Sequence, residues 1–153
     1  MNNLNHTFAN GPARVLWAED NAQDRMLIEE SLDGKGASAL TVVADGVHLL
    51  EALETKRPDL VVLDLKMPRL GGLEVLRRIR SHVDWQGLPV TIFSSGNRPD
   101  EIEHCKALGV NEIVQKPVDF DLFSMAVQRV VGSARPAPAD GAPPALPNRA
   151  ASR

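Results

Sequence analysis

Five short apolar segments rich in β-branched residues recur along the chain. Short runs of this kind, bounded by polar residues, are typical of β-strands. They predict strands at 14–18 (RVLWA), 39–43 (ALTVV), 59–63 (DLVVL), 90–94 (VTIFS) and 111–115 (NEIVQ). The middle segments do not alternate with polar residues, as expected for strands that are covered on both faces of a sheet.

A stretch with helical spacing follows each predicted strand. In the clearest one, residues 119–131, Asp119 is the predicted N-cap. One face of this helix is predicted to carry Leu122, Phe123, Ala126, Val127 and Val130. The other four helices are predicted to begin near Asn21, Asp45, Gly72 and Pro99. The chain therefore has a (βα)5 pattern, which predicts an α/β domain with a parallel sheet between two layers of helices.

Length and composition narrow the classes of protein. With 153 residues, 43% of them hydrophobic, the chain suits one domain. The net charge of -3 argues against a nucleic-acid partner. The single Cys105 cannot form an internal disulfide, and no apolar run approaches the ~20 residues that cross a membrane. The start of the chain lacks the pattern of a secretion signal, so we expect no membrane contact and a cytoplasmic location.

The two ends of the chain differ in composition from the middle. We expect residues 1–12 to form a flexible arm and residues 13–131 to form the domain. Residues 132–153 are built mainly of Ala and Pro and predict a disordered tail. Such a tail is not expected to form a second folded domain.

Polar side chains stand where the predicted strands end. Glu19 and Asp20 follow the first strand, Asp64 follows the third, Ser94 ends the fourth, and Lys116 follows the fifth. In a parallel sheet, the carboxyl ends of the strands meet at one edge, and ligands bind there. The sequence therefore predicts that acids, a hydroxyl and an ammonium group come together from distant positions.

Clustered carboxylates repel one another unless a cation lies between them, and oxygen ligands of this kind suit Mg²⁺. If one carboxylate is also a nucleophile, it can attack a phosphoryl group. Lys116 and the Ser94 hydroxyl would then neutralise the phosphoryl oxygens. Asp64, alone on the middle strand, is the best placed nucleophile.

The segments WAEDN, VVLDLKMPRLGG, PVTIFSSG and QKP together resemble the receiver domain of two-component response regulators over about residues 13–131. The resemblance implies a doubly wound, flavodoxin-like sheet with strand order 2-1-3-4-5 and phosphorylation of Asp64 by a sensor histidine kinase. It implies Mg²⁺ bound by Asp20, Asp64 and the main-chain carbonyl of Lys66, with Glu19 assisting. The protein would not be a conventional enzyme, although it would assist its own phosphotransfer and autodephosphorylation.

The resemblance also makes Ser94 the switch hydroxyl and Lys116 the ion-pair partner of the phosphoryl group. Two positions depart from the family pattern. Gly71 replaces the usual acid of the loop after the third strand, and Ile113 replaces the usual aromatic residue of the fifth strand. The aromatic rotamer switch is therefore in doubt, and signalling is expected to rely on movement of residues 94–108.

Within the family, the segments LGVNEI and KPVDFDLF are similar to small stand-alone regulators that partner bacterial phytochromes and related kinases. The implied partners are a sensor histidine kinase and a downstream protein or phosphotransfer protein. Pairing of two copies through the face of the last helix stays open, as do the role of the Lys66 side chain and the choice between Ser94 and Ser95.

Three other functions compete with this one. A degenerate receiver would act only as a protein-interaction scaffold, but the intact acids and Lys116 argue against it. A phosphatase of the haloacid dehalogenase type needs a second acid where Lys66 stands. A flavin-binding flavodoxin-like protein needs a phosphate loop after the first strand, where the acids of EDNAQD would repel phosphate.

Overall fold

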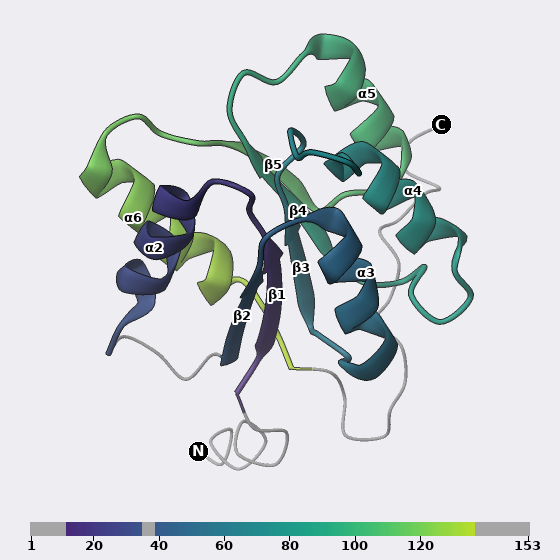
Figure 1. Cartoon of the computed structure of the whole chain (residues 1–153), viewed down its shortest axis with the longest axis horizontal. Helices are drawn as coiled ribbons and strands as arrows, with labels where there is room; N and C mark the ends of the chain where they lie inside the picture. The colour runs from purple at the N-terminus through teal and green to yellow at the C-terminus, as the bar shows by residue number, and fades with distance from the viewer. Residues whose placement is uncertain (1–11, 35–38, 137–153) are drawn as a thin grey trace, which may run out of the picture.

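The computed structural model describes residues 12–34 and 39–136. Its strands are β1 (Arg14–Ala18), β2 (Ala39–Val43), β3 (Leu60–Leu63), β4 (Val90–Ser94) and β5 (Glu112–Gln115). They form one parallel sheet in the order β2-β1-β3-β4-β5 (Figure 1). The predicted doubly wound fold and its strand order are confirmed. Residues 1–11 of the predicted arm and 137–153 of the predicted tail lie outside the described residues, so both stay predictions.

Five helices of the described residues cover the two faces of the sheet. They are α2 (Ala22–Leu32), α3 (Gly46–Thr55), α4 (Gly72–Ser81), α5 (Pro99–Ala107) and α6 (Phe120–Gly132). Helices α2 and α6 pack on one face, and α3, α4 and α5 lie on the other (Figure 1). Within the described part of the chain, no helix is long and apolar enough to cross a membrane.

Two strands begin one residue later than predicted because a polar residue pairs at each start. The Asp59 backbone N–H donates to the Arg14 carbonyl at 2.8 Å, and the Asp59 carboxylate accepts from the Arg14 N–H at 2.7 Å. Asn111 does the same at the start of β5, with its N–H and side-chain oxygen both bonded to Val90. At each start, a side-chain oxygen takes the place of a main-chain acceptor, so the regular strand begins at the next residue.

Alternate residues of the strands point into two separate cores. Trp17 of β1 is fully buried under α2 and α6. Its ring packs edge to face against the Phe93 ring, with 5.2 Å between the ring centroids. Phe93 contacts Phe123 of α6 in the same way at 5.4 Å. The predicted apolar face of α6 is wrong at Leu122, which is 55% exposed. The buried positions of α6 are Phe123, Val127, Val130 and Val131.

The predicted helix starts are confirmed by capping contacts. The side chains of Asn21, Asp45 and Asp119 accept from the N–H three residues on, and Pro99 stands in the first turn of α5. Helix α4 begins differently, because Gly72 lies directly against the end of β3. A Cβ atom at Gly72 would lie 2.2 Å from the Asp64 carbonyl oxygen, so only glycine fits there.

Arg80 joins three segments at the end of the domain opposite the carboxyl ends of the strands. From α4, its guanidinium donates to the carbonyls of Leu108 at 2.7 Å and Leu88 at 2.8 Å. It also donates to those of Gln86 and Gly109 at 3.1 Å. The loop before β4 and the turn after α5 are therefore held by one side chain.

Candidate functional site

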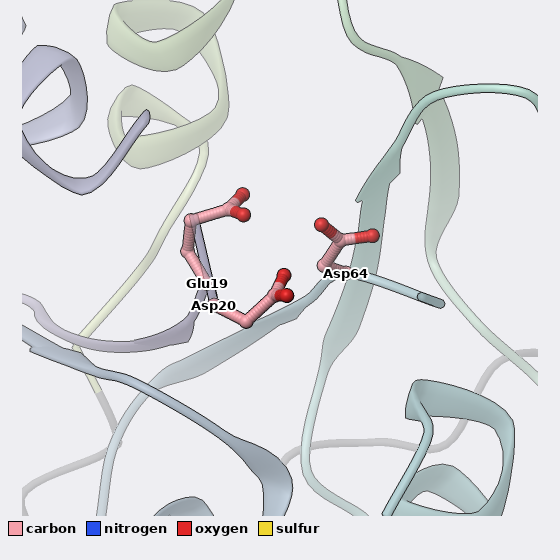
Figure 2. Close-up of side chains that lie close together, drawn as sticks. All are labelled: Glu19, Asp20 and Asp64. Atoms are coloured by element: carbon pink, nitrogen blue, oxygen red, sulfur yellow. The ribbon is translucent and has the colours of Figure 1, made fainter. Parts of the chain in front are cut away.

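Three carboxylates meet at the carboxyl ends of β1 and β3. Oxygens of Glu19, Asp20 and Asp64 lie within 4.8 Å of one another, and their side chains turn toward a common space (Figure 2). Glu19 and Asp64 are buried, whereas Asp20 is exposed. An all-oxygen set with one open side suits Mg²⁺, which prefers carboxylate ligands and keeps several waters. The predicted cluster is therefore assembled, and its donor set fits a hard divalent cation.

Lys116 enters this cluster from the end of β5. Its Nζ lies 2.7 Å from Glu19 Oε1 and 2.8 Å from Asp64 Oδ2. It also lies 3.1 Å from Asp24 Oδ2, a contact that the sequence reasoning missed. The backbone N–H of Lys116 donates to the Ser94 carbonyl at 3.0 Å, which fixes its position beside β4.

Asp64 is held on both of its carboxylate oxygens. Ser94 Oγ donates to Oδ1 at 2.7 Å, and the Lys66 backbone N–H donates to the same oxygen at 3.1 Å. Lys116 donates to Oδ2. Ser94 is buried, while Ser95 is exposed. Of the two hydroxyl groups, that of Ser94 is therefore the one in contact with Asp64.

Charge in the cluster is unbalanced. Burial raises the pKa of Glu19, and the charge of Asp64 adds to this rise against the opposing effect of Lys116. For Lys116, burial opposes the charge, but contact with Asp64 and Glu19 raises its pKa above the ordinary value. The Lys116 ammonium thus contacts three acids, and a fourth acid, Asp20, lies beside two of them, which favours binding of a further cation.

The acidic loop after β1 is held by α2. The Arg25 guanidinium donates to the main-chain carbonyls of Glu19 and Asp20, each at 2.9 Å. The Asn21 N–H donates to Glu19 Oε2 at 3.2 Å. Sequence reasoning did not single out Arg25 or Asp24. For Arg25, the signal that could have suggested the contact is its place in the helix that directly follows the two acids.

The loop between β3 and α4 is linked to the start of α3. Arg69 has a φ of 66°, a left-handed conformation that is unusual for a residue with a side chain. Its guanidinium forms an ion pair with Asp45. Hydrogen bonds from the His48 backbone N–H, together with the contact to Arg69, lower the pKa of Asp45 to about 2 against the cost of burial. This pair fixes one side of the loop that carries Lys66.

The exposed Lys66 side chain reaches the loop after β4. A Cβ atom at Gly96 would lie 2.9 Å from Lys66 Nζ, so the ammonium rests beside the Gly96 backbone. Gly96 itself has a φ of 59°. The Lys66 ammonium therefore stays at the rim of the site, beside the loop that follows Ser94.

The family model of the response regulator receiver domain matches residues 15–128. The chain belongs to this family. Receiver domains bind Mg²⁺ in an acidic pocket and partner with sensor histidine kinases in two-component signalling. Glu19, Asp20 and Asp64 form an acidic cluster in this chain.

Among curated proteins, the receiver is 31% identical over 124 residues to the transcriptional regulatory protein PdtaR of Mycobacterium tuberculosis. This match covers 81% of the chain and 59% of PdtaR. The receiver is also 31% identical over 111 residues to the CAI-1 autoinducer sensor kinase/phosphatase CqsS of Vibrio cholerae. This second match covers 72% of the chain and 16% of CqsS. The receiver thus spans only part of the length of these relatives.

Solved structures of two regulators resemble the receiver closely. The phosphorylated cyanobacterial phytochrome response regulator RcpA superposes with a TM-score of 0.73 at 29% identity, covering 78% of this chain and 91% of RcpA. The Mn²⁺-bound response regulator Rcp1 gives a TM-score of 0.74 at 25% identity, covering 82% of this chain and 99% of Rcp1. The predicted similarity to stand-alone phytochrome response regulators is confirmed.

Both departures from the family pattern are visible in the receiver. Gly71 is the N-cap of α4 and offers no side-chain hydrogen bond to the helix. Ile113 is half-buried in β5 and packs against the core under α3, α4 and α5. An aliphatic side chain in this position cannot make the aromatic rotamer change. That signalling relies instead on movement of residues 94–108 stays a prediction.

Proposed function

We propose that this receiver accepts a phosphoryl group on Asp64 from a phosphorylated histidine of a sensor kinase. The observation that carries the proposal is the placement of the Asp64 carboxylate between the Ser94 hydroxyl and the Lys116 ammonium, beside two other acids. A buried carboxylate with these neighbours is a nucleophile surrounded by groups that can neutralise a phosphoryl group.

In the proposed transfer, an oxygen of Asp64 forms a bond to phosphorus, and the bond between phosphorus and the histidine nitrogen breaks. The nitrogen keeps the electron pair, and the product is an acyl phosphate on Asp64. Negative charge then resides on the phosphoryl oxygens. We propose that Ser94, which donates to Asp64 before transfer, turns its hydrogen bond to these oxygens, and that Lys116 donates to them while it stays beside Asp64.

The proposed ligands for Mg²⁺ are Asp20, Asp64 and the main-chain carbonyl of Lys66, with Glu19 assisting. When bound, the ion would neutralise charge on the phosphoryl oxygens during transfer. The chain's own residues hold the ligands in place: Arg25 fixes the carbonyls of Glu19 and Asp20, and the Lys66 N–H fixes Asp64.

We further propose that the kinase partner is of the phytochrome type, which the similarity to RcpA and Rcp1 supports. The output would be a contact with a downstream protein, or transfer of the phosphoryl group to another protein, that depends on the state of Asp64. Comparing phosphotransfer from a phytochrome kinase with that from an unrelated sensor kinase tests this partner.

The decisive experiment is intact-protein mass spectrometry after incubation with acetyl phosphate and Mg²⁺. The wild type should gain one phosphoryl group, Asp64→Asn should gain none, and Asp121→Asn, an exposed acid of α6, should match the wild type. An unmodified wild type would favour the scaffold function instead. Equal modification of the Asp64→Asn variant would show that another residue accepts the group.

A further inference from the structure

The Lys116 ammonium is shared among three carboxylates of different character. Its Nζ lies within 3.1 Å of oxygens from Glu19, Asp64 and Asp24. The ammonium donates hydrogen bonds to Asp64 and Asp24, and it lies 2.7 Å from Glu19 Oε1 as an ion pair. A phosphoryl oxygen that approaches Lys116 must therefore compete with acids that already contact the ammonium.

The three partners differ in what their release would cost. The side chains of Glu19 and Asp64 are 0% and 6% exposed, so losing the ammonium would leave a buried charge without compensation. The side chain of Asp24 is 26% exposed, and water can replace its ion pair. Asp24 also stands outside the carboxylate cluster that fits the metal.

We propose that Asp24 is a positioning residue that holds Lys116 in the resting receiver and releases it when the phosphoryl group arrives. This inference rests on the proposed phosphorylation of Asp64 and adds a regulatory element to it. In the resting protein, the Asp24 carboxylate competes with the phosphoryl oxygens for the same ammonium. Its negative charge also repels the anionic phosphoryl donor.

The contact is built into the start of α2. The Asn21 side chain accepts from the Asp24 N–H at 2.9 Å, which fixes the first turn of the helix. Lys116 is fixed from the other side by its backbone hydrogen bond to Ser94. Both partners therefore meet because their backbones are anchored. Replacing Asp24 by a neutral residue removes the negative charge beside Lys116 without removing either backbone anchor.

The test compares the rates at which variants gain a phosphoryl group from acetyl phosphate at saturating Mg²⁺. Acetyl phosphate avoids any effect on kinase docking. Asp24→Asn should react roughly two- to fivefold faster than the wild type, and the gain should shrink at high salt. Asp24→Glu, which keeps the charge, should stay near the wild-type rate. The matched control is Asp33→Asn, an exposed acid beyond the other end of α2, which should leave the rate unchanged.

A structural readout completes the test. In crystals of the wild type with Mg²⁺ and beryllofluoride, a phosphoryl mimic, Lys116 Nζ should lie beyond about 4 Å from Asp24 and contact the mimic. An intact Asp24 contact in that complex, or an Asp24→Asn rate at or below that of the wild type, would overturn this inference alone. A wild type that gains no phosphoryl group would overturn the proposed function as well.

Discussion

The Ser94 hydroxyl donates to Asp64 Oδ1 at 2.7 Å, although the two residues are 30 positions apart in the sequence. The same hydroxyl oxygen accepts a hydrogen bond from the Leu65 N–H at 3.3 Å. Ser94 thus bridges the ends of β3 and β4. It is the side chain through which a change of charge on Asp64 can reach the loop after β4.

Replacing Ser94 by Ala should slow phosphorylation of the receiver by acetyl phosphate about ten- to a hundredfold. The substitution removes a hydrogen bond to a charged group that is proposed to follow the phosphoryl group. Ser94→Thr keeps the hydroxyl and should retain most of the rate. The exposed Ser95 provides the control, and a Ser95→Ala rate as low as that of Ser94→Ala would contradict the assignment.

Trp17 should report Mg²⁺ binding by a change in fluorescence emission, because it is buried in β1 two residues before Glu19. The measurement is made in a Trp85→Phe variant, so that the emission comes from Trp17 alone. In the wild type, the Trp85 ring stacks on His82 with 3.7 Å between the ring centroids. Asp20→Asn should raise the apparent Kd for Mg²⁺ at least about tenfold. Addition of EDTA should reverse the change. An unaltered midpoint in Asp20→Asn would remove Asp20 from the ligand set.

Gly72→Ala should lower the free energy of unfolding by about 3 kcal/mol, because the new Cβ would clash with the backbone of Asp64 and Leu65. Urea titration measures the change. Gly132→Ala is the matched control, since a Cβ at Gly132 meets nothing within 4 Å. Similar stability for both variants would mean that α4 can move away from β3 at little cost.

Asp45→Ala should lower the free energy of unfolding by about 1–2 kcal/mol at pH 7 through loss of the α3 cap. The pKa of Asp45 is lowered from 3.8 to about 2, so its carboxylate stabilises the folded state fully above pH 4. That contribution is lost as the pH falls from about 4 to about 2. The difference between variant and wild type should shrink over this window in urea titrations. A difference that stays constant with pH would contradict a stabilising role for the Asp45 charge.

The sequence was sufficient to predict which polar residues come together at one edge of the sheet, because these residues stand where apolar strands of a parallel sheet end. Asp64 and Lys116 stand out as polar groups where a buried run ends, and the sheet order decides that they meet. Asp24 could not be placed in this way, since an acid in the first turn of a helix also suits the helix dipole. Its contact depends on where α2 lies relative to β5, which local pattern does not specify.

Two further features depended on tertiary packing. Helical spacing placed Leu122 on the buried face of α6, but the helix packs through Phe123 and Val127 and leaves Leu122 exposed. Periodicity fixes the width of an apolar face only to within a residue at its edge. The left-handed backbone of Arg69 could not be predicted from the sequence, because that conformation is usually expected at Gly or Asn.

The hydrogen bonds of the Arg80 guanidinium hold one end of α5 more firmly than the other. The C-terminal turn of α5 is tied through Leu108 and Gly109 to α4 and to the segment before β4. Its N-terminal end at Pro99 follows the loop that leaves Ser94, and Cys105 is the buried residue of the helix. A displacement that begins at Ser94 would therefore rotate α5 about its anchored C-terminal end, with the largest movement at Pro99.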